Sequence, residues 1–249
     1  MSSENERTRV RVADLIAQVR GEWIPLTHSF SYFAVTPLAP EEVKQFLQDP
    51  INALPSDFCA SLPCVRVLLS PYLERGNKRI GDYVVFQQPA DSKDLIWSQE
   101  PDASGVTFAF AIKDVDLAEY HYWFYNALAA LAASQSSSPA MAEFTRLVDS
   151  ELKAEVHGEV DEKSWELKQE IVRAPKAPGK SSKRLQEYVQ QAFQDTLTLF
   201  LHGICCDIDV ETGPRQMSSR HLRKRLELLQ RHFPPPKGYT VLPEQAKRR

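Results

Sequence analysis

The sequence predicts an α+β protein: a mixed or antiparallel sheet with short helices in the N-terminal half, and a helical C-terminal half packed on it. Three observations predict this class. Up to about residue 112, short β-branched and aromatic runs alternate with Pro, Gly, Asn and Asp turn signals. From Asp116 onward, apolar residues recur three and four positions apart, which is the period of a helix. The 249 residues, 43% hydrophobic and 25% charged, have an ordinary globular composition.

The N-terminal elements follow from these patterns. An amphipathic helix is expected over residues 8–20, and a second one from Ala39-Pro40 to about residue 50, because proline and the two acids after it suit a first helical turn. Strands are expected where the chain is apolar between turn signals. The predicted strands are 30–36, 64–69, 82–87 and 106–112.

The first helix of the C-terminal half is unusually aromatic. Asp116 is its expected N-cap, and a stripe from Leu117 to Leu131 is its apolar face. Tyr122 and Trp123 lie off this stripe, so the helix is either buried on most sides or a surface for a partner. We predict that Phe124, on the stripe, is buried.

The remaining helices are marked by caps and breakers. Ser138-Pro139 begins a helix that runs to about residue 156, and residues 165–172 fit either a helix or a strand. Helices are also expected over 183–204 and 219–232, the latter ended by three prolines. The segment 174–182 is the predicted linker. The expected organisation is therefore an α+β half over 1–134 and a helical half over 135–249.

Two ligand-loop patterns fail on physical grounds. The string from Ala174 to Ser181 fits a loose phosphate-loop pattern, but its two prolines remove backbone donors that a phosphate needs. The acids from Asp207 to Glu211 resemble a calcium loop, but glycine stands at position 7, and Ser218 replaces the glutamate at position 12. We interpret the first as a linker and the second as a turn.

Cysteine usage indicates a reducing compartment. The four cysteines comprise the pair Cys59 and Cys64 and the adjacent pair Cys205 and Cys206, a spacing that favours neither disulfides nor a structural zinc site. No segment is apolar over the roughly 18 residues that a membrane span requires. A cytoplasmic protein that contacts no membrane is expected.

A metal-dependent hydrolase is the alternative function that the residues leave open. Two neighbouring helices carry acids and histidines that would suit a metal, although the HExxH and Glu-x-x-His spacings are absent. The residues of this alternative metal site are Glu151, Glu155, His157, His202 and Asp207.

The clearest asymmetry in the sequence is electrostatic. Residues 215–249 contain ten Lys and Arg and two Glu, a net charge of +8, so the preceding 214 residues carry −11 of the overall −3. In the last helix, Leu222, Leu226, Leu229 and Phe233 form the apolar stripe. The cations that lie off this stripe are Arg220, Arg223, Lys224 and Arg231. Such a surface either rests on the acidic body of the same chain or contacts an acidic partner.

We therefore predict a non-catalytic interaction or regulatory protein without a cofactor, whose partner is another, acidic protein. Nucleic acid is the second alternative partner, and the oligomeric state stays open. No catalytic constellation meets its physical requirements in this chain. The predicted partner-binding residues are Arg220, Arg223, Lys224, Arg231, Tyr122 and Trp123.

Overall fold

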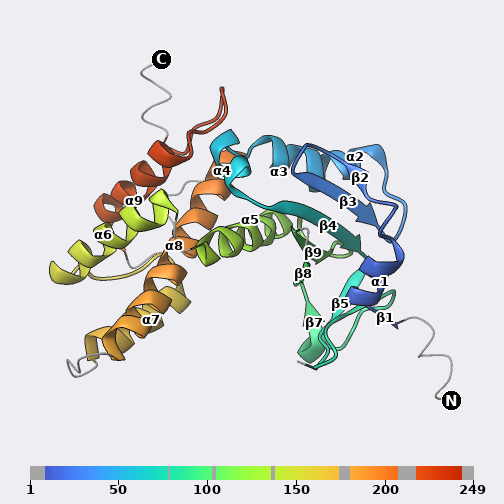
Figure 1. Ribbon diagram of the computed structural model, residues 1–249, viewed down its shortest axis with the longest axis horizontal. Helices are drawn as coiled ribbons and strands as arrows, with labels where there is room; N and C mark the ends of the chain where they lie inside the picture. Colours follow the sequence, from blue (N-terminus) through green and yellow to red (C-terminus); the bar gives the residue numbers. More distant parts are fainter. Residues whose placement is uncertain are drawn as a thin grey trace. The chain divides into compact units, whose positions relative to one another are not determined.

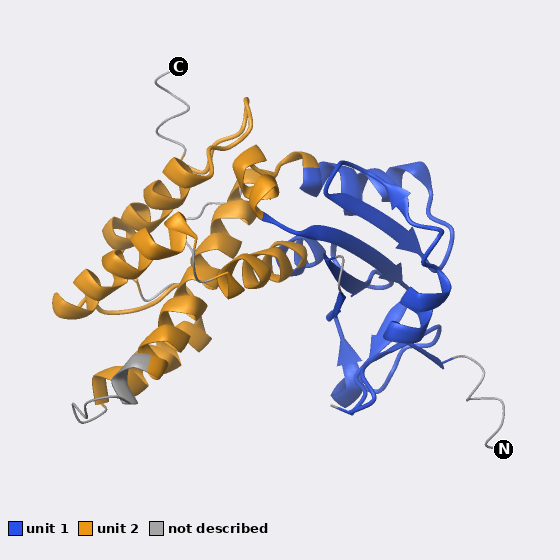
Figure 2. Ribbon diagram, viewed as in Figure 1, with its two compact units in different colours: residues 1–51, 62–123 blue, residues 52–61, 124–249 orange. Residues whose placement is uncertain are grey.

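The computed structural model confirms an α+β fold (Figure 1). It describes residues 9–77, 79–102, 105–135, 138–173, 180–206 and 217–242, with backbone alone at 180–182. The chain forms two compact units, shown in Figure 2. Unit 1 comprises Met1–Ile51 and Leu62–Trp123, and unit 2 comprises Asn52–Ser61 and Phe124–Arg249. The division into an α+β half over 1–134 and a helical half over 135–249 stays a prediction.

Unit 1 is built on a five-stranded mixed sheet in the order β2-β3-β4-β9-β8. The three inner strands run parallel to one another, whereas the two edge strands are antiparallel to their neighbours. The strands are β2 (Ile24–Pro25), β3 (Phe30–Ala34), β4 (Cys64–Ser70), β8 (Trp97–Asp102) and β9 (Gly105–Ala111).

The inner strands β4 and β9 are buried on both faces of the sheet. After its first residue, each strand is buried at every position. This is typical of parallel strands, because helices or other layers cover them from both sides. Their near-continuous apolar sequence follows from this double burial.

A smaller antiparallel sheet and a short helix cover one face of the large sheet. The small sheet has the order β1-β6-β5-β7, and its side chains join a cluster in which Val12, Leu68, Leu73 and Ala109 are buried. The elements of this layer are β1 (Arg9–Arg11), α1 (Val12–Gln18), β5 (Tyr72–Glu74), β6 (Tyr83–Val85), the 3₁₀ turn Asp91–Lys93 and β7 (Asp94–Leu95).

Helical segments cover the other face. Tyr120, fully buried in the second turn of α5 (Leu117–Ser134), packs edge-on against Phe110 of β9 and Phe46. Phe46 lies in a π-helical segment that continues one helix into the next. These elements are α2 (Pro40–Val43), the π-helical segment Lys44–Gln48 and α3 (Asp49–Asn52).

Unit 2 is a bundle of helices around an apolar core. The rings of Phe144 and Phe193 meet edge to face at 5.2 Å, and those of Phe58 and Phe233 meet at 5.4 Å. Its helices, with the C-terminal part of α5, are α4 (Ser56–Ser61), α6 (Pro139–Lys153), α7 (Glu162–Arg173), α8 (Lys180–Cys206) and α9 (Ser219–His232). Phe124 is fully buried, as predicted.

The helix starts agree with the capping signals. The Asp116 carboxylate accepts hydrogen bonds from the backbone N–H groups of Ala118 and Glu119, and the Ser138 hydroxyl accepts one from Met141. Each cap satisfies donors that the first helical turn leaves without an intrahelical partner.

Several local predictions are corrected. Residues 8–20 contain strand β1 before α1, because Arg9–Arg11 pairs with β6 across the small sheet. The ambiguous segment 165–172 is helical, within α7. Strands β2, β5, β7 and β8 were not predicted from the sequence. Of the predicted linker 174–182, which holds the phosphate-loop pattern, residues 174–179 lie outside the described residues, whereas 180–182 belong to α8 and not to a linker. The acidic segment at 207–213 also lies outside the described residues.

Among the described helices, none combines the length and the apolar character that crossing a bilayer requires.

Candidate functional site

Helix α9 carries four of the six predicted partner-binding residues. Its leucine stripe is buried as expected, and Arg220 and Lys224 are exposed. Within the described residues, Lys224 has no ion pair. Arg223 is half-buried and is not free of interactions. The helix therefore docks through leucines and presents part of its positive charge outward.

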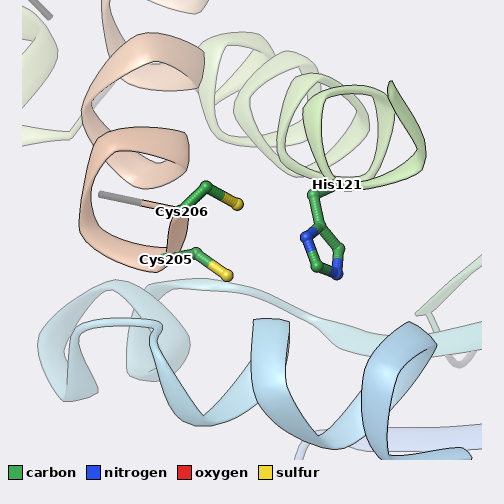
Figure 3. Close-up of side chains that lie close together, drawn as sticks. All are labelled: His121, Cys205 and Cys206. Carbon is green, nitrogen blue, oxygen red and sulfur yellow. The ribbon is translucent and has the colours of Figure 1, made fainter. Parts of the chain in front are cut away.

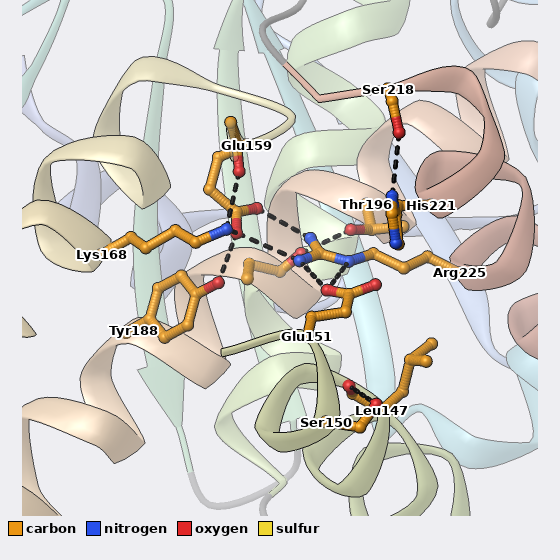
Figure 4. A network of polar contacts seen from close by, with 12 residues as sticks. Leu147, Ser150, Glu151, Glu159, Lys168, Tyr188, Thr196, Ser218, His221 and Arg225 are labelled. Atoms are coloured by element: carbon orange, nitrogen blue, oxygen red, sulfur yellow. Dashed lines mark hydrogen bonds and ion pairs between the residues drawn. The ribbon is translucent and has the colours of Figure 1, made fainter. Parts of the chain in front are cut away.

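Arg225, which the sequence analysis did not single out, lies at the centre of a buried charge network (Figure 4). Its side chain is completely inaccessible to solvent. It donates to Glu151 from Nε at 3.0 Å and from Nη2 at 2.6 Å, and to Glu159 from Nη1 at 2.7 Å and from Nη2 at 3.0 Å. This guanidinium therefore joins α9 to α6 and to the segment between α6 and α7.

Glu159 binds two further groups in the same network. The ammonium of Lys168, on α7, lies 3.1 Å from Glu159 Oε1 and donates to the Gly158 carbonyl at 2.8 Å. The Tyr188 hydroxyl, on α8, also donates to Glu159. Two buried cations thus face two buried carboxylates, and the network connects α6, α7, α8 and α9.

The pKa values of these groups follow from burial and from their partners. Burial alone would raise the pKa of Glu159, but the charge and hydrogen bonds of Arg225 outweigh it and hold the pKa below its ordinary value. Burial, together with the negative charge of Glu159, raises the pKa of Tyr188. Glu159 is therefore held in its ionised form and Tyr188 in its protonated form, so the Tyr188 hydroxyl is the donor in their hydrogen bond.

Arg231 belongs to a second ion pair, which lies at the surface. Its guanidinium and the His232 ring both bind the carboxylate of Glu143 on α6, the His232 Nε2 at 2.8 Å. The hydrogen bond from His232 is the main cause that lowers the pKa of Glu143. Part of the positive charge of α9 is thus neutralised by an acid of the same chain. This was one of the two alternatives for the basic surface, the other being contact with an acidic partner.

A groove runs between α6 and α9 with a volume of about 350 Å³. It combines cations from both helices with two leucines and two acids. Its lining residues are Glu143, Arg146, Leu147, Lys224, Glu227, Leu228 and Arg231. Two of the predicted partner-binding residues, Lys224 and Arg231, therefore meet Arg146, which the sequence analysis did not identify.

The two predicted aromatic residues lie in unit 1. Tyr122 and Trp123 are half-buried, and their rings pack edge to face at 5.2 Å. His121, one residue earlier on α5 (Figure 3), is buried, and its Nε2 lies 2.9 Å from the Gln45 carbonyl oxygen. These residues are not part of the α6–α9 groove.

The described residues do not assemble the alternative metal site. Glu151 faces Arg225, whereas the His157 ring packs edge-on against Trp165 at 4.9 Å. Glu155 is exposed, His202 is buried beside Tyr125, and Asp207 lies outside the described residues. Within the described chain, no three of these side chains bring ligand atoms within 4.8 Å of one another.

The cysteines are free thiols, as the sequence predicts. Cys205 and Cys206 occupy the last turn of α8 (Figure 3). The hydrogen bond with Cys205, followed by burial, raises the pKa of Cys206. A raised pKa disfavours the reactive thiolate, so this feature supports no nucleophilic role for Cys206.

Asp195 on α8 is a buried acid that makes stability depend on pH. Burial is the main cause that raises its pKa to about 6, against the opposing hydrogen bonds of Ser164 and Gln191. The native state therefore binds this proton more tightly than the unfolded state, so Asp195 favours folding less as the pH rises from about 4 to 6.

We expect Asp195→Asn to remove this decrease of stability between pH 4 and pH 6. The variant should be more stable than wild type at pH 7 by about 2 kcal/mol. Urea unfolding of wild type and variant from pH 4 to pH 7.5 measures the difference. Exposed Asp57→Asn is the control and should leave this dependence of stability on pH in place. Identical slopes in wild type and Asp195→Asn would contradict the assignment.

The sequence did contain a signal for Arg225. Positions 222, 225, 226 and 229 follow the i, i+3, i+4, i+7 pattern of one helix face, so Arg225 stands within the leucine stripe. A charge at such a position requires a buried partner of opposite sign. The pattern indicates that a partner exists, but it does not say which acid it is.

No family model, no curated protein and no solved structure matches this chain.

Proposed function

We propose that this protein is a non-catalytic interaction protein that binds an acidic protein segment in the groove between α6 and α9. The observation that carries the proposal is the composition of this groove, in which Arg146, Lys224 and Arg231 surround two leucines. An acidic segment with apolar side chains would complement both features.

The charges of the groove differ in how far they are already neutralised. Arg231 is paired with Glu143, whereas Lys224 has no ion pair within the described residues and Arg146 makes a long 3.4 Å hydrogen bond to the Ala142 carbonyl. Lys224 and Arg146 are therefore the cations of the groove that are least neutralised by the chain itself and most available to a partner. Replacing them also leaves the Arg231–Glu143 contact between α6 and α9 intact.

We expect the double variant Arg146→Ser/Lys224→Ser to bind a fluorescein-labelled polyglutamate peptide about tenfold more weakly than wild type at low salt. The measurement is fluorescence anisotropy at 20 mM and 300 mM NaCl. The matched control is Lys153→Ser/Lys183→Ser, which removes the same net charge from exposed residues outside the groove. The control should change the affinity by less than about threefold, since exposed i,i+4 pairs contribute little.

Two results would contradict the proposal. If the groove variant and the control bind equally at both salt concentrations, the groove is not the contact surface, and Tyr122 and Trp123 become the candidates. If an oligothymidylate binds wild type more tightly than the peptide, with a steep linear fall of log affinity against log salt, the ligand is nucleic acid.

A further inference from the structure

One face of the large sheet in unit 1 carries a row of polar residues. Arg66 of β4 pairs in register with Thr107 of β9, and Thr107 pairs with Glu100 of β8. Residues that are directly opposite in neighbouring strands point to the same face of a sheet. Arg66, Thr107 and Glu100 therefore lie side by side on that face.

A second carboxylate, Asp82, is held against the same face. Its Oδ2 accepts a hydrogen bond of 2.6 Å from the Ser98 hydroxyl, and its Oδ1 accepts one of 3.1 Å from the Gly76 backbone. Ser98 is two residues before Glu100 on β8 and so shares its face. Each carboxylate oxygen of Asp82 keeps a lone pair for another ligand.

Glu100 lies beside Asp82, and no described basic residue pairs with it. A Cβ atom at Gly81 would lie 3.6 Å from Glu100 Oε1, which places this carboxylate against the chain next to Asp82. Burial and the negative charge of Asp82 both raise the pKa of Glu100. Within the described residues, neither acid forms an ion pair with a basic side chain.

The basic residue of this row, Arg66, is already paired with an acid. Arg66 binds Asp102 with Nη1 at 2.8 Å and Nη2 at 3.1 Å, so its charge is neutralised by another carboxylate. Among the described residues, the Asp82–Glu100 pair is therefore the charge of this row that no basic side chain neutralises. Two like charges at close range need a cation or a proton between them.

Thr107 supplies an independent indication of a ligand. The residue is 1% exposed, and its Oγ1 has no hydrogen-bond partner in the part of the chain that the structure describes. A buried hydroxyl is normally paired, so an orphaned one directly opposite Glu100 in the sheet calls for an explanation. Carboxylate and hydroxyl oxygens together form the ligand set that hard divalent cations prefer.

We propose that Asp82, Glu100 and the Thr107 hydroxyl bind a hard divalent cation on this face of the sheet. The cation would neutralise the two carboxylates and occupy the free lone pairs of Thr107. Water would fill its remaining coordination positions, as is usual for Mg²⁺ and Mn²⁺. This site is independent of the α6–α9 groove, and its failure would leave the proposed function unaffected.

The test is Mn²⁺ binding to the full-length, chelator-treated protein at pH 7.5, measured by electron paramagnetic resonance of free Mn²⁺. One saturable site with a Kd below about 1 mM is expected. Asp82→Asn and Glu100→Gln should each weaken binding at least tenfold, and Thr107→Val should weaken it severalfold. Asp91→Asn, an exposed acid elsewhere in unit 1, is the matched control and should bind as wild type does.

Thermal unfolding separates a lost site from a lost fold. Without metal, Glu100→Gln should melt at a higher temperature than wild type, because the repulsion from Asp82 is removed. With 1 mM Mn²⁺, wild type and Asp91→Asn should gain the most stability, Thr107→Val less, and Asp82→Asn and Glu100→Gln the least. Absence of saturable binding, or equal binding by Glu100→Gln, would overturn the proposal and assign a shared proton to the pair instead.

Discussion

Arg225→Met should lower the free energy of unfolding by about 3 to 5 kcal/mol. The substitution preserves much of the side-chain volume, but it removes the guanidinium that neutralises two buried carboxylates. Glu159 keeps Lys168 and Tyr188 as partners, whereas Glu151 loses its ion pair. The large cost therefore comes from one uncompensated charge in the interior, and it is measured by urea unfolding at pH 7.

A second substitution, at the Arg225 partner Glu151, tests whether the unpaired carboxylate causes the loss. Adding Glu151→Gln to Arg225→Met should recover about 1 to 2 kcal/mol, because it removes the stranded charge and keeps the shape of the side chain. Exposed Arg220→Ala on the same helix should stay within about 0.5 kcal/mol of wild type. A loss equally small for Arg225→Met would show that the network does not hold the bundle together.

Phe124→Ala should destabilise the protein by about 3 to 5 kcal/mol, since it removes a fully buried ring and leaves a cavity in unit 2. The control is Phe86→Ala, whose ring is 43% exposed and whose truncation should cost far less. Chemical denaturation of both variants gives the comparison. A loss below about 1 kcal/mol for Phe124→Ala would show that the site collapses around the smaller side chain.

The sequence predicted those parts of the fold that are formed by residues a few positions apart in the chain. The caps at Asp116 and Ser138 are formed by side chains that reach backbone groups two or three residues ahead. The bounds of α9, Ser219–His232, agree with the prediction because the leucine period and the following prolines act within one segment.

The missed elements depend on distant partners. Strand β1 forms because Arg9–Arg11 pairs with residues 83–85, and an apolar period cannot report such a pairing. The two-residue strands β2 and β7 are too short to carry any alternation. Long-range backbone pairing therefore decided the small sheet and the edges of the large one.

The sequence by itself determined the α+β class, the caps at Asp116 and Ser138, the bounds of α9 and the accumulation of positive charge in this last helix. Tertiary structure alone decided which charged side chains form ion pairs within the molecule. Arg225 meets acids 66 and 74 residues away, and Arg231 meets one 88 residues away. The reason is physical: helical and strand periods reflect interactions between near neighbours, whereas the partner of a charge depends on the distance in space that packing imposes.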